Sequence, residues 1–304
     1  MKDIAILGAT ASGKTALSIK LAKEFGANIL SLDSLSIYKE IDIASAKPTP
    51  KERCEIEHFG IDEIYPNENF NVSIFLDIYK KAKKISEKQS KHLIIVGGTG
   101  FYLKSLLSGL SPKPTISKES KNRVLDTLFD TEKAFGFIEK HDKTYAEKIS
   151  PNDSYRIEKW LEIYFETGSS ASAYFENNKQ KPLILDIDIF EIETDKSRLK
   201  ERIKLRTKGM LKNGLIDEVV YLEKNYTREP NSMKSIGIKE TLEFLDGFIN
   251  RDELEEKITQ NTAKLAKRQR TFNSTQFPPH IKADTETLYK EIKKSLTKKE
   301  TKEN

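Results

Sequence analysis

The stretch Gly8-Ala9-Thr10-Ala11-Ser12-Gly13-Lys14-Thr15 decides the fold of this chain. It has the form G-x-x-x-x-G-K-T, follows a short apolar run at residues 4–7 and precedes a helical pattern at residues 16–25. A strand, a glycine-rich turn and a helix in this order form a loop whose backbone N–H groups surround phosphate. The alternative is a helix cap with ordinary turn glycines, but motif and flanks agree with the loop. The stretch therefore predicts an oligophosphate site.

The positions of this loop have separate predicted roles. We expect Lys14 to reach the terminal phosphate and the Thr15 hydroxyl to bind Mg²⁺. The N-terminus of the following helix adds partial positive charge. The remaining residues of the phosphate site are Gly8, Thr10, Ala11, Ser12 and Gly13. The loop alone does not distinguish phosphate transfer, hydrolysis or departure of a diphosphate.

Length and composition set wide limits on function. A chain of 304 residues can bury a full core and form one large or two modest domains. Its net charge of +5 fits a nucleic-acid partner without establishing one. Cys54 is the single cysteine, which excludes an internal disulfide and a cysteine-based zinc site; we expect a small, semi-buried side chain. Without a signal peptide or a transmembrane stretch, a cytoplasmic monomer with no membrane contact is expected.

The second predicted strand, residues 28–32, ends at Asp33. Ligands of open α/β sheets bind at the carboxyl ends of the strands, so Asp33 should lie beside the phosphate loop. There its carboxylate could act as a base or hold a metal-bound water. A helix N-cap formed by Asp33 or Ser34 is an equally good interpretation of the spacing.

A third predicted strand runs from His92 into Gly97-Gly98-Thr99. Nucleoside triphosphatases with a phosphate loop usually end this strand in a metal-holding aspartate, which is missing here. The glycines would let a substrate approach the backbone closely, or they form a tight turn into the next helix, and both can hold together. His58 lies in a mixed polar segment and is interpreted as a surface or structural histidine.

The helical and strand patterns predict an α/β fold, a P-loop NTPase-like parallel sheet with helices on both faces and an all-helical insertion. We assign residues 1–112 and 181–280 to the core, 113–180 to the insertion and 281–304 to a lysine-rich tail whose marginal helix frays. Strand character returns at Leu183–Ile192, where apolar residues alternate with Asp186 and Asp188.

Three groups of cations suggest anion contacts. Arg202 and Arg206 lie one turn apart beside the apolar stripe of a helix that begins near residue 196, where an arginine can clamp an oxyanion or reach out to solvent. Arg156 and Lys159 interleave with Trp160 and Tyr164, a pattern that suits RNA stacking and core packing equally well. Lys264, Lys267 and Arg268 share one face of a later helix.

Taken together, these segments resemble the transfer-RNA dimethylallyltransferases, also called isopentenyl-transferases. The phosphate loop is similar to that family's G-P-T-A-S-G-K-T, with Ala9 in place of proline. Further matches are Asp33-Ser34 with Ile37-Tyr38, Asp42-Ile43 and Ala46-Lys47-Pro48; Val96 to Lys104; Asn152-Asp153 with Arg156; Gly214-Leu215 with Glu218; Ile236-Gly237 with Lys239-Glu240; and Ala266-Lys267-Arg268-Gln269. The resemblance spans residues 4 to about 272. Without a zinc element after the core, the chain looks like the bacterial form.

The resemblance implies prenyl transfer from dimethylallyl diphosphate to N6 of adenine 37, beside the anticodon of transfer RNA. It implies that Asp33 is the general base, that Arg206 lies on the diphosphate side, and that Mg²⁺ assists. The residues it implies for the anticodon stem-loop are Asp33, Ser34, Leu35, Ser36, Thr99, Arg123, Tyr155, Arg156, Lys159, Ile236, Gly237, Lys239, Lys267 and Arg268. The sequence departs from the family at Ser36, Lys159, Trp160, Ile238 and Phe272, which puts individual RNA contacts in question.

Two other classes of function share part of this pattern. A small-molecule or nucleotide kinase would use the same loop with ATP, but the helical insertion, the basic patches and the missing metal-holding aspartate speak against it. A non-catalytic RNA-binding module would explain the basic helices and leave the phosphate loop without a role.

Overall fold

The computed structural model describes residues 1–53 and 56–297 and divides the chain into two compact units. One unit comprises residues 1–105 together with the chain from residue 184 onward, and the other comprises residues 106–183. The expected junctions at 112/113 and 180/181 thus lie a few residues inside the second unit. Cys54 lies outside the described residues.

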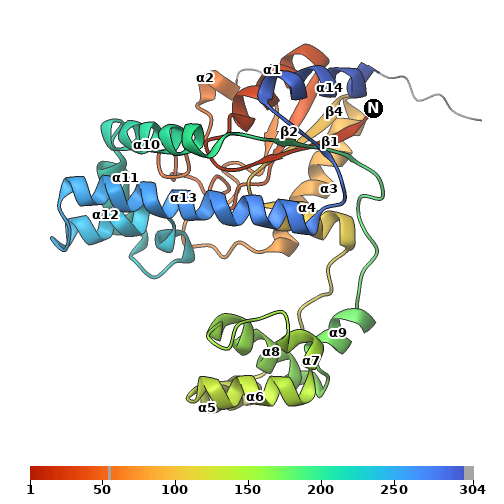
Figure 1. Cartoon of the computed structure of the whole chain (residues 1–304), viewed down its shortest axis with the longest axis vertical. Coiled ribbons are helices and arrows are strands. Elements are labelled where there is room, and N and C mark those ends of the chain that lie inside the picture. Colours follow the sequence, from red (N-terminus) through yellow and green to blue (C-terminus); the bar gives the residue numbers. More distant parts are fainter. Residues whose placement is uncertain (54–55, 298–304) are drawn as a thin grey trace, which may run out of the picture. The chain divides into compact units, whose positions relative to one another are not determined.

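The larger unit is built on a six-stranded sheet with the strand order β3-β2-β4-β1-β5-β6, in which every pairing is parallel (Figure 1). Its strands are β1 (Asp3–Gly8), β2 (Ala27–Ser31), β3 (His58–Phe59), β4 (His92–Gly97), β5 (Asp188–Ile192) and β6 (Ile281–Ala283). The central strands are continuous buried runs, as expected for a parallel sheet covered on both faces. The phosphate loop and Asp33 both follow the carboxyl ends of strands and therefore meet at one edge of the sheet.

Helices cover both faces of this sheet, as the sequence predicts (Figure 1). On one face α1 (Lys14–Phe25) and α14 (Thr285–Thr297) pack over Ile4 and Ile6. On the other lie α3 (Val72–Lys88), which contacts β2 and β4, and α4 (Gly100–Ser108). None of the helices in residues 1–53 and 56–297 has the length and apolar character needed to cross a membrane.

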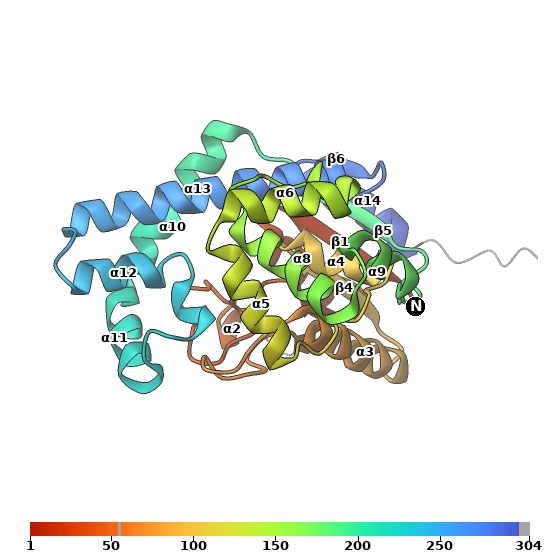
Figure 2. The same ribbon diagram turned by 90° about the horizontal axis from the view of Figure 1, so that it is seen from below.

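This unit has further helices besides those that cover the sheet. They are α2 (Pro50–Arg53), α10 (Lys196–Lys212), α11 (Leu215–Tyr226), the short 3₁₀ turn Asn231–Lys234, α12 (Ile238–Leu245) and α13 (Arg251–Gln276). Two of them, α10 and α13, contact the phosphate loop. The long α13 packs against α10 and α12, and both views show it beside α12 (Figures 1 and 2). Leu199, Ile203 and Met210 on α10 are buried, as their helical spacing predicts.

Two expectations about the elements differ from the structure. The strand expected at Leu183–Ile192 begins only at Asp188, because β5 takes its register from β1, where Ile4 pairs with Asp188 near the start of the strand. The C-terminal segment is not a frayed tail up to residue 297: β6 pairs with β5, and the stripe Leu288, Ile292 and Leu296 of α14 is buried against the core. Tertiary packing stabilises this helix beyond its own propensity. Residues 298–304 lie outside the described part.

The smaller unit is all-helical, as expected for the insertion; residues 106–183, all of them described, contain no strand. Its helices are α5 (Lys118–Leu128), α6 (Thr131–His141), α7 (Lys143–Ala146), α8 (Ser154–Thr167) and α9 (Ala171–Asn177). Trp160 is fully buried, stacks on Tyr164 with ring centroids 4.9 Å apart, and donates to Asp142 Oδ2 at 2.8 Å. Of the two interpretations left open for Trp160, core packing is the one the structure bears out.

Candidate active site

The phosphate loop connects β1 to α1 through two glycines in conformations that other residues rarely adopt. Gly8 has φ 155° and Gly13 has φ 102°. A Cβ atom on Gly8 would lie 2.9 Å from Ser12 Oγ. The turn is closed by a hydrogen bond from the Ser12 N–H to the carbonyl of Ala9 at 3.2 Å. The glycines thus allow the tight curl that the sequence predicts.

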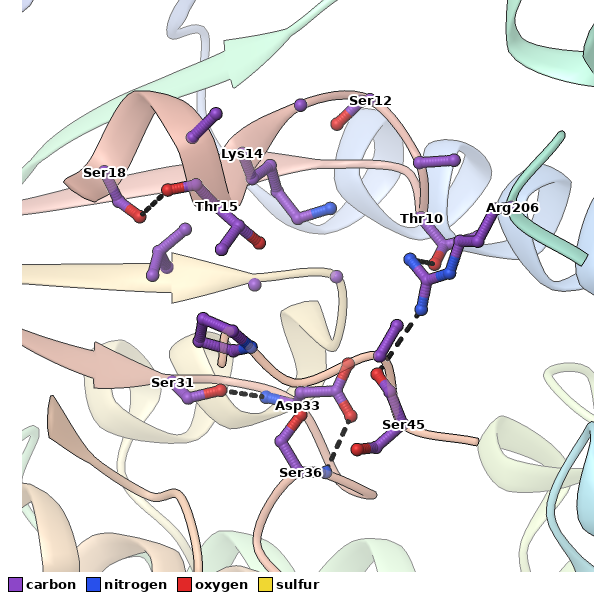
Figure 3. A pocket seen from close by; sticks show the side chains of 18 of the residues that line it. Thr10, Ser12, Lys14, Thr15, Ser18, Ser31, Asp33, Ser36, Ser45 and Arg206 are labelled. Carbon is purple, nitrogen blue, oxygen red and sulfur yellow. Dashed lines mark hydrogen bonds between the residues drawn. The ribbon is translucent and has the colours of Figure 1, made fainter. Parts of the chain in front are cut away.

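A pocket of about 640 Å³ lies against this loop (Figure 3). It brings together segments that are far apart in the chain: the loop, the end of β2, the Gly97-Gly98 end of β4, and α10. The predicted site residues that line it are Thr10, Ala11, Ser12, Gly13, Lys14, Thr15, Asp33, Ser36 and Arg206. Gly8, Ser34, Leu35 and Thr99 are not among the lining residues.

Lys14 is the cation at the centre of the loop. Its ammonium donates to the carbonyl of Ala9 at 2.7 Å. Burial lowers the pKa of Lys14 to about 8; the carboxylate of Asp33 opposes this shift, and the charge of Arg206 adds to it. An anion entering the pocket would favour the charged form of this side chain.

Asp33 has one oxygen engaged in the local fold. Its Oδ1 accepts from the backbone N–H groups of Leu35 at 2.8 Å and Ser36 at 3.2 Å. Asp33 therefore caps the turn after β2. Residues 34–37 form a turn and no helix, so the interpretation of Asp33 as a helix N-cap is wrong. Among the hydrogen bonds of the described residues none involves Oδ2, and the side chain lines the pocket, so this oxygen is available to accept a proton.

Arg206 enters the pocket from α10. Its guanidinium donates to Thr10 Oγ1 at 3.5 Å and to the carbonyl of Ser45 at 3.3 Å. Burial lowers the pKa of Arg206, and Asp33 opposes that shift. Within residues 1–53 and 56–297 no carboxylate forms an ion pair with it, so its charge is open to an anionic ligand. Arg202, one turn earlier, holds the carbonyl of Ser12 at 3.1 Å.

The glycines at the end of β4, Gly97 and Gly98, are in contact with the protein itself as well as with the pocket. A Cβ on Gly97 would lie 2.5 Å from Leu32 Cβ, and one on Gly98 would overlap the side-chain amide of Gln269. Gln269 Oε1 in turn accepts from the Thr10 N–H at 2.8 Å. Close packing against Leu32 therefore requires glycine at position 97, whereas at position 98 a side chain would displace the Gln269 amide. Thr99 is half-buried and lies beyond the pocket wall.

Sequence reasoning missed two residues of this site. Gln269 was recognised only as part of a family block, although it joins α13 to the phosphate loop. His58, interpreted as a surface or structural histidine, lines the pocket. Its Nδ1 lies 2.8 Å from the carbonyl of Ile56, and burial lowers its pKa, so the ring is a neutral wall of the pocket near neutral pH. No pattern in the sequence indicates His58 as a site residue, and only the family resemblance marks Gln269.

Apart from Asp33 to Ser36 and Thr99, the predicted RNA-binding residues of the larger unit lie on α13 and around the start of α12. Lys264, Lys267 and Arg268 line one shallow hollow on α13 together with Phe272. Lys239 is exposed, and Ile236 is half-buried. Gly237 is buried with φ 95°, and its N–H donates to the carboxylate of Glu240 at 2.7 Å; its position follows from the start of α12.

The predicted RNA-binding residues of the smaller unit differ in how far their charges are engaged. Arg123 stacks over the ring of Phe165 at 4.3 Å. Arg156 lies 3.4 Å from Asp153, and Tyr155 is 68% exposed. Lys159 donates to Glu158 at 2.5 Å and to Glu162 at 2.8 Å. Lys159 is thus the least available of these cations for a phosphate.

The sequence and the fold match known proteins over almost the whole chain. The profile of the IPP transferases matches residues 36–276. A tRNA dimethylallyltransferase of Aliarcobacter butzleri is 57% identical over 277 residues, which cover 91% of this chain and 93% of that protein. The corresponding protein of Helicobacter pylori is 46% identical over 276 residues, 91% of this chain and 88% of its own.

Two solved structures share the fold. The tRNA delta(2)-isopentenylpyrophosphate transferase of Staphylococcus epidermidis superposes with a TM-score of 0.69 at 31% identity, covering 97% of this chain and 99% of the other. A eukaryotic dimethylallyltransferase acting on tRNA superposes with a TM-score of 0.74 at 29% identity, covering 90% of this chain and 70% of the other.

Proposed function

The chain belongs to the IPP transferase family, and from this premise we propose how its pocket performs the reaction, transfer of a dimethylallyl group from dimethylallyl diphosphate to N6 of adenine 37 of transfer RNA. The observation that carries the proposal is the convergence of Lys14 and Arg206 on one pocket beside Asp33. Two cations face a leaving diphosphate, and a carboxylate oxygen is free to take a proton. A kinase would need a metal-holding aspartate after β4, where the chain has Gly97-Gly98-Thr99.

The first part of the proposal concerns the donor. The backbone N–H groups of the phosphate loop and Lys14 bind the diphosphate, and Arg206 contacts it from α10. When the allylic C1–O bond breaks, the electron pair leaves with the diphosphate. Charge then grows on the bridging oxygen, and donors already in place stabilise it more than they stabilise the bound donor. A diphosphate leaving group therefore explains why an enzyme that transfers a prenyl group contains a phosphate loop.

The second part concerns the acceptor. The lone pair of N6 is delocalised into the adenine ring, so this nitrogen attacks carbon poorly while it keeps both protons. As the N6–C1 bond forms, Asp33 Oδ2 accepts one proton from N6 and acts as the general base. The base must leave its stack to reach a pocket at the edge of the sheet, as in other enzymes that modify bases.

The residues present fit a magnesium ion that is bound together with the diphosphate. The described residues contain no group of three or more His, Cys, Asp or Glu side chains that could hold a metal ion, so the ion would take most of its ligands from the diphosphate and water. The Thr15 hydroxyl is exposed and lines the pocket, with Asp33 nearby in the same lining. Mg²⁺ commonly takes few protein ligands and completes its shell with phosphate oxygens and water. Bound there, it would neutralise charge on the leaving group.

Transfer RNA is the partner, and we propose two sets of cations for its anticodon stem-loop. One is the hollow of Lys264, Lys267 and Arg268 on α13. The other comprises Arg123 and Arg156 of the helical unit, with exposed Tyr155 available for stacking. A monomer in the cytoplasm, where transfer RNA is made, completes the proposal.

Incubation of the full chain with unmodified transfer RNA, dimethylallyl diphosphate and Mg²⁺ tests this function. Nucleosides from the digested RNA are then analysed by mass spectrometry. We expect N6-dimethylallyladenosine at position 37 and equimolar diphosphate. An RNA with guanosine at that position is the matched control and should stay unmodified. Release of inorganic phosphate from ATP, with no prenylated nucleoside, would support a kinase instead.

A further inference from the structure

The carboxylate of Glu218, on α11, holds a loop that is distant in the chain. Its Oε2 accepts from the backbone N–H groups of Asp42 at 2.9 Å and Ile43 at 2.7 Å, and its Oε1 accepts from that of Ala44 at 2.9 Å. Three successive N–H groups thus point at one charged acceptor, and such charge-assisted hydrogen bonds are stronger than neutral ones. Residues 42–44 are therefore tied firmly to α11.

The next residue of this loop reaches the candidate active site. Ser45 lines the pocket, and its carbonyl accepts from Arg206 Nη2 at 3.3 Å. The Ser45 hydroxyl donates back to the carbonyl of Ile41 at 2.5 Å, so Ser45 is fixed to the segment that Glu218 holds. The position of the Ser45 carbonyl follows from the backbone of residues 42–44.

Arg206 depends on that carbonyl for its orientation. Among the described residues its guanidinium has only two hydrogen-bond partners, the Ser45 carbonyl and the Thr10 hydroxyl, and both are neutral. A carboxylate partner would hold the arginine in place, but its negative charge would weaken the attraction of the arginine for an anionic ligand. Because its partners are neutral, Arg206 keeps its full charge for an anion. The orientation of its guanidinium then depends on how firmly the loop that carries Ser45 is held.

We propose that Glu218 is a positioning residue for prenyl transfer: by fixing residues 42–44 it places the Ser45 carbonyl, which aims the Arg206 guanidinium at the leaving diphosphate. The proposal rests on the proposed role of Arg206. Its physical basis is that a side chain must be held closely to be effective in a transition state, and small displacements far from the reaction are costly.

Glu218→Gln is the sharpest single change. The glutamine keeps the shape of the side chain but offers one oxygen, so its amide N–H₂ must face at least one of the three backbone donors. We expect kcat to fall about 10- to 100-fold, the usual cost of a small displacement of a catalytic group, and the affinity for inorganic diphosphate with Mg²⁺ to fall with it. Affinity for transfer RNA should change by less than twofold.

Asp217→Asn is the matched control, because Asp217 precedes Glu218 on α11, is exposed, and loses the same charge. It should leave kcat and diphosphate affinity unchanged. Thermal unfolding of both variants distinguishes a local shift from loss of the fold. If Glu218→Gln is unfolded at the assay temperature to an extent that accounts for its loss of activity, the positioning role is wrong. The role is also wrong if Glu218→Gln keeps the wild-type kcat.

A double-mutant cycle with Arg206→Ala tests whether Glu218 acts through Arg206. If it does, Glu218→Gln should cost less than twofold in kcat once Arg206 is alanine. Fully additive losses would overturn the inference and leave the role of Arg206 intact. A single Arg206→Ala variant with normal kcat and diphosphate affinity would instead overturn the role of Arg206, and the inference with it.

Discussion

The ammonium group of Lys14 donates a hydrogen bond to the backbone carbonyl of Ala9, at a distance of 2.7 Å within the same loop. The partner is a neutral oxygen, so it compensates the buried charge less than a carboxylate would. Burial lowers the pKa of Lys14 to about 8, although the Asp33 carboxylate opposes the shift. The loop thus keeps a cation that gains stability when an anion binds.

The first prediction concerns proton uptake by Lys14. At about pH 8.5 part of the protein has a neutral Lys14, and diphosphate should restore the charge, so binding should take up protons. Calorimetry in two buffers with different ionisation enthalpies measures this uptake. Lys14→Arg should show none beyond that of the ligand itself, because arginine stays charged. Equal uptake by both proteins would contradict the lowered pKa.

The same shift predicts how stability depends on pH. The pKa of Lys14 is lower in the folded chain than the ordinary value of 10.5. Between about pH 8 and 10.5 the unfolded chain binds more protons, so the contribution of this group to stability should rise with pH across that window. Below pH 8 Lys14 is protonated in both the folded and the unfolded chain, so the free-energy cost of burying its charge is fully present. Denaturant unfolding of wild type and Lys14→Met, compared across this range, should converge as pH rises.

Asp33→Asn separates the two roles of this residue. Asparagine keeps an oxygen for the N–H groups of Leu35 and Ser36, so the turn after β2 should persist. It cannot accept the proton of N6, so kcat should fall by about 10²–10⁴. Diphosphate affinity should change little. Single-turnover assays measure the rate of prenyl transfer, and a rate within a few-fold of wild type would exclude Asp33 as the base.

The two glycines at the end of β4, Gly97 and Gly98, should respond differently to substitution by alanine. In Gly97→Ala the new Cβ meets Leu32, including its backbone, which cannot move away easily; we expect a loss of about 1–3 kcal/mol in stability. In Gly98→Ala it meets the far end of the Gln269 side chain, which can move but then releases the Thr10 N–H. Gly98→Ala should therefore unfold nearly normally and bind diphosphate more weakly. Denaturant melts and calorimetry check the pair, and the reverse order would contradict this packing.

Two lysines should differ in their effect on RNA binding. Lys267 is exposed on α13, whereas Lys159 is engaged by Glu158 and Glu162. Lys267→Ala should remove about one phosphate contact. The slope of log K for transfer RNA binding against log salt concentration should then become shallower by about 0.7–0.9. Lys159→Ala should change the slope less. Arg156→Ala with Lys267→Ala should weaken RNA binding further and spare diphosphate binding. Filter binding across a salt series measures the slopes, and unchanged slopes would mean that these cations are only solvated.

Removal of the metal should stop turnover. We expect a chelator to abolish prenyl transfer and added Mg²⁺ to restore it, because the ion neutralises charge on the leaving diphosphate. Thr15→Val should raise the Mg²⁺ concentration needed for half-maximal rate, and Thr15→Ser, which keeps the hydroxyl, should not. Full activity in the chelator would show that Lys14 and Arg206 suffice without a metal.

Much of the fold and part of the site follow from local sequence. The curl of Gly8 to Thr15 is set by adjacent residues, because glycine is needed at positive φ and the strand and helix on either side are themselves local patterns. The parallel sheet follows from buried apolar strands alternating with helices. Asp33 could be placed beside the loop because the carboxyl ends of parallel strands share one edge.

Tertiary structure decided what local spacing cannot encode. Gln269 reaches Thr10, and Glu218 reaches residues 42–44, across more than half of the chain, and each contact depends on which face of a helix turns towards a loop. The stripe of α14 reads as marginal in sequence because its stability comes from α1 and the sheet, which no local pattern contains. Sequence by itself predicts which groups carry the chemistry of this protein; packing between distant segments decided which other groups hold them in place.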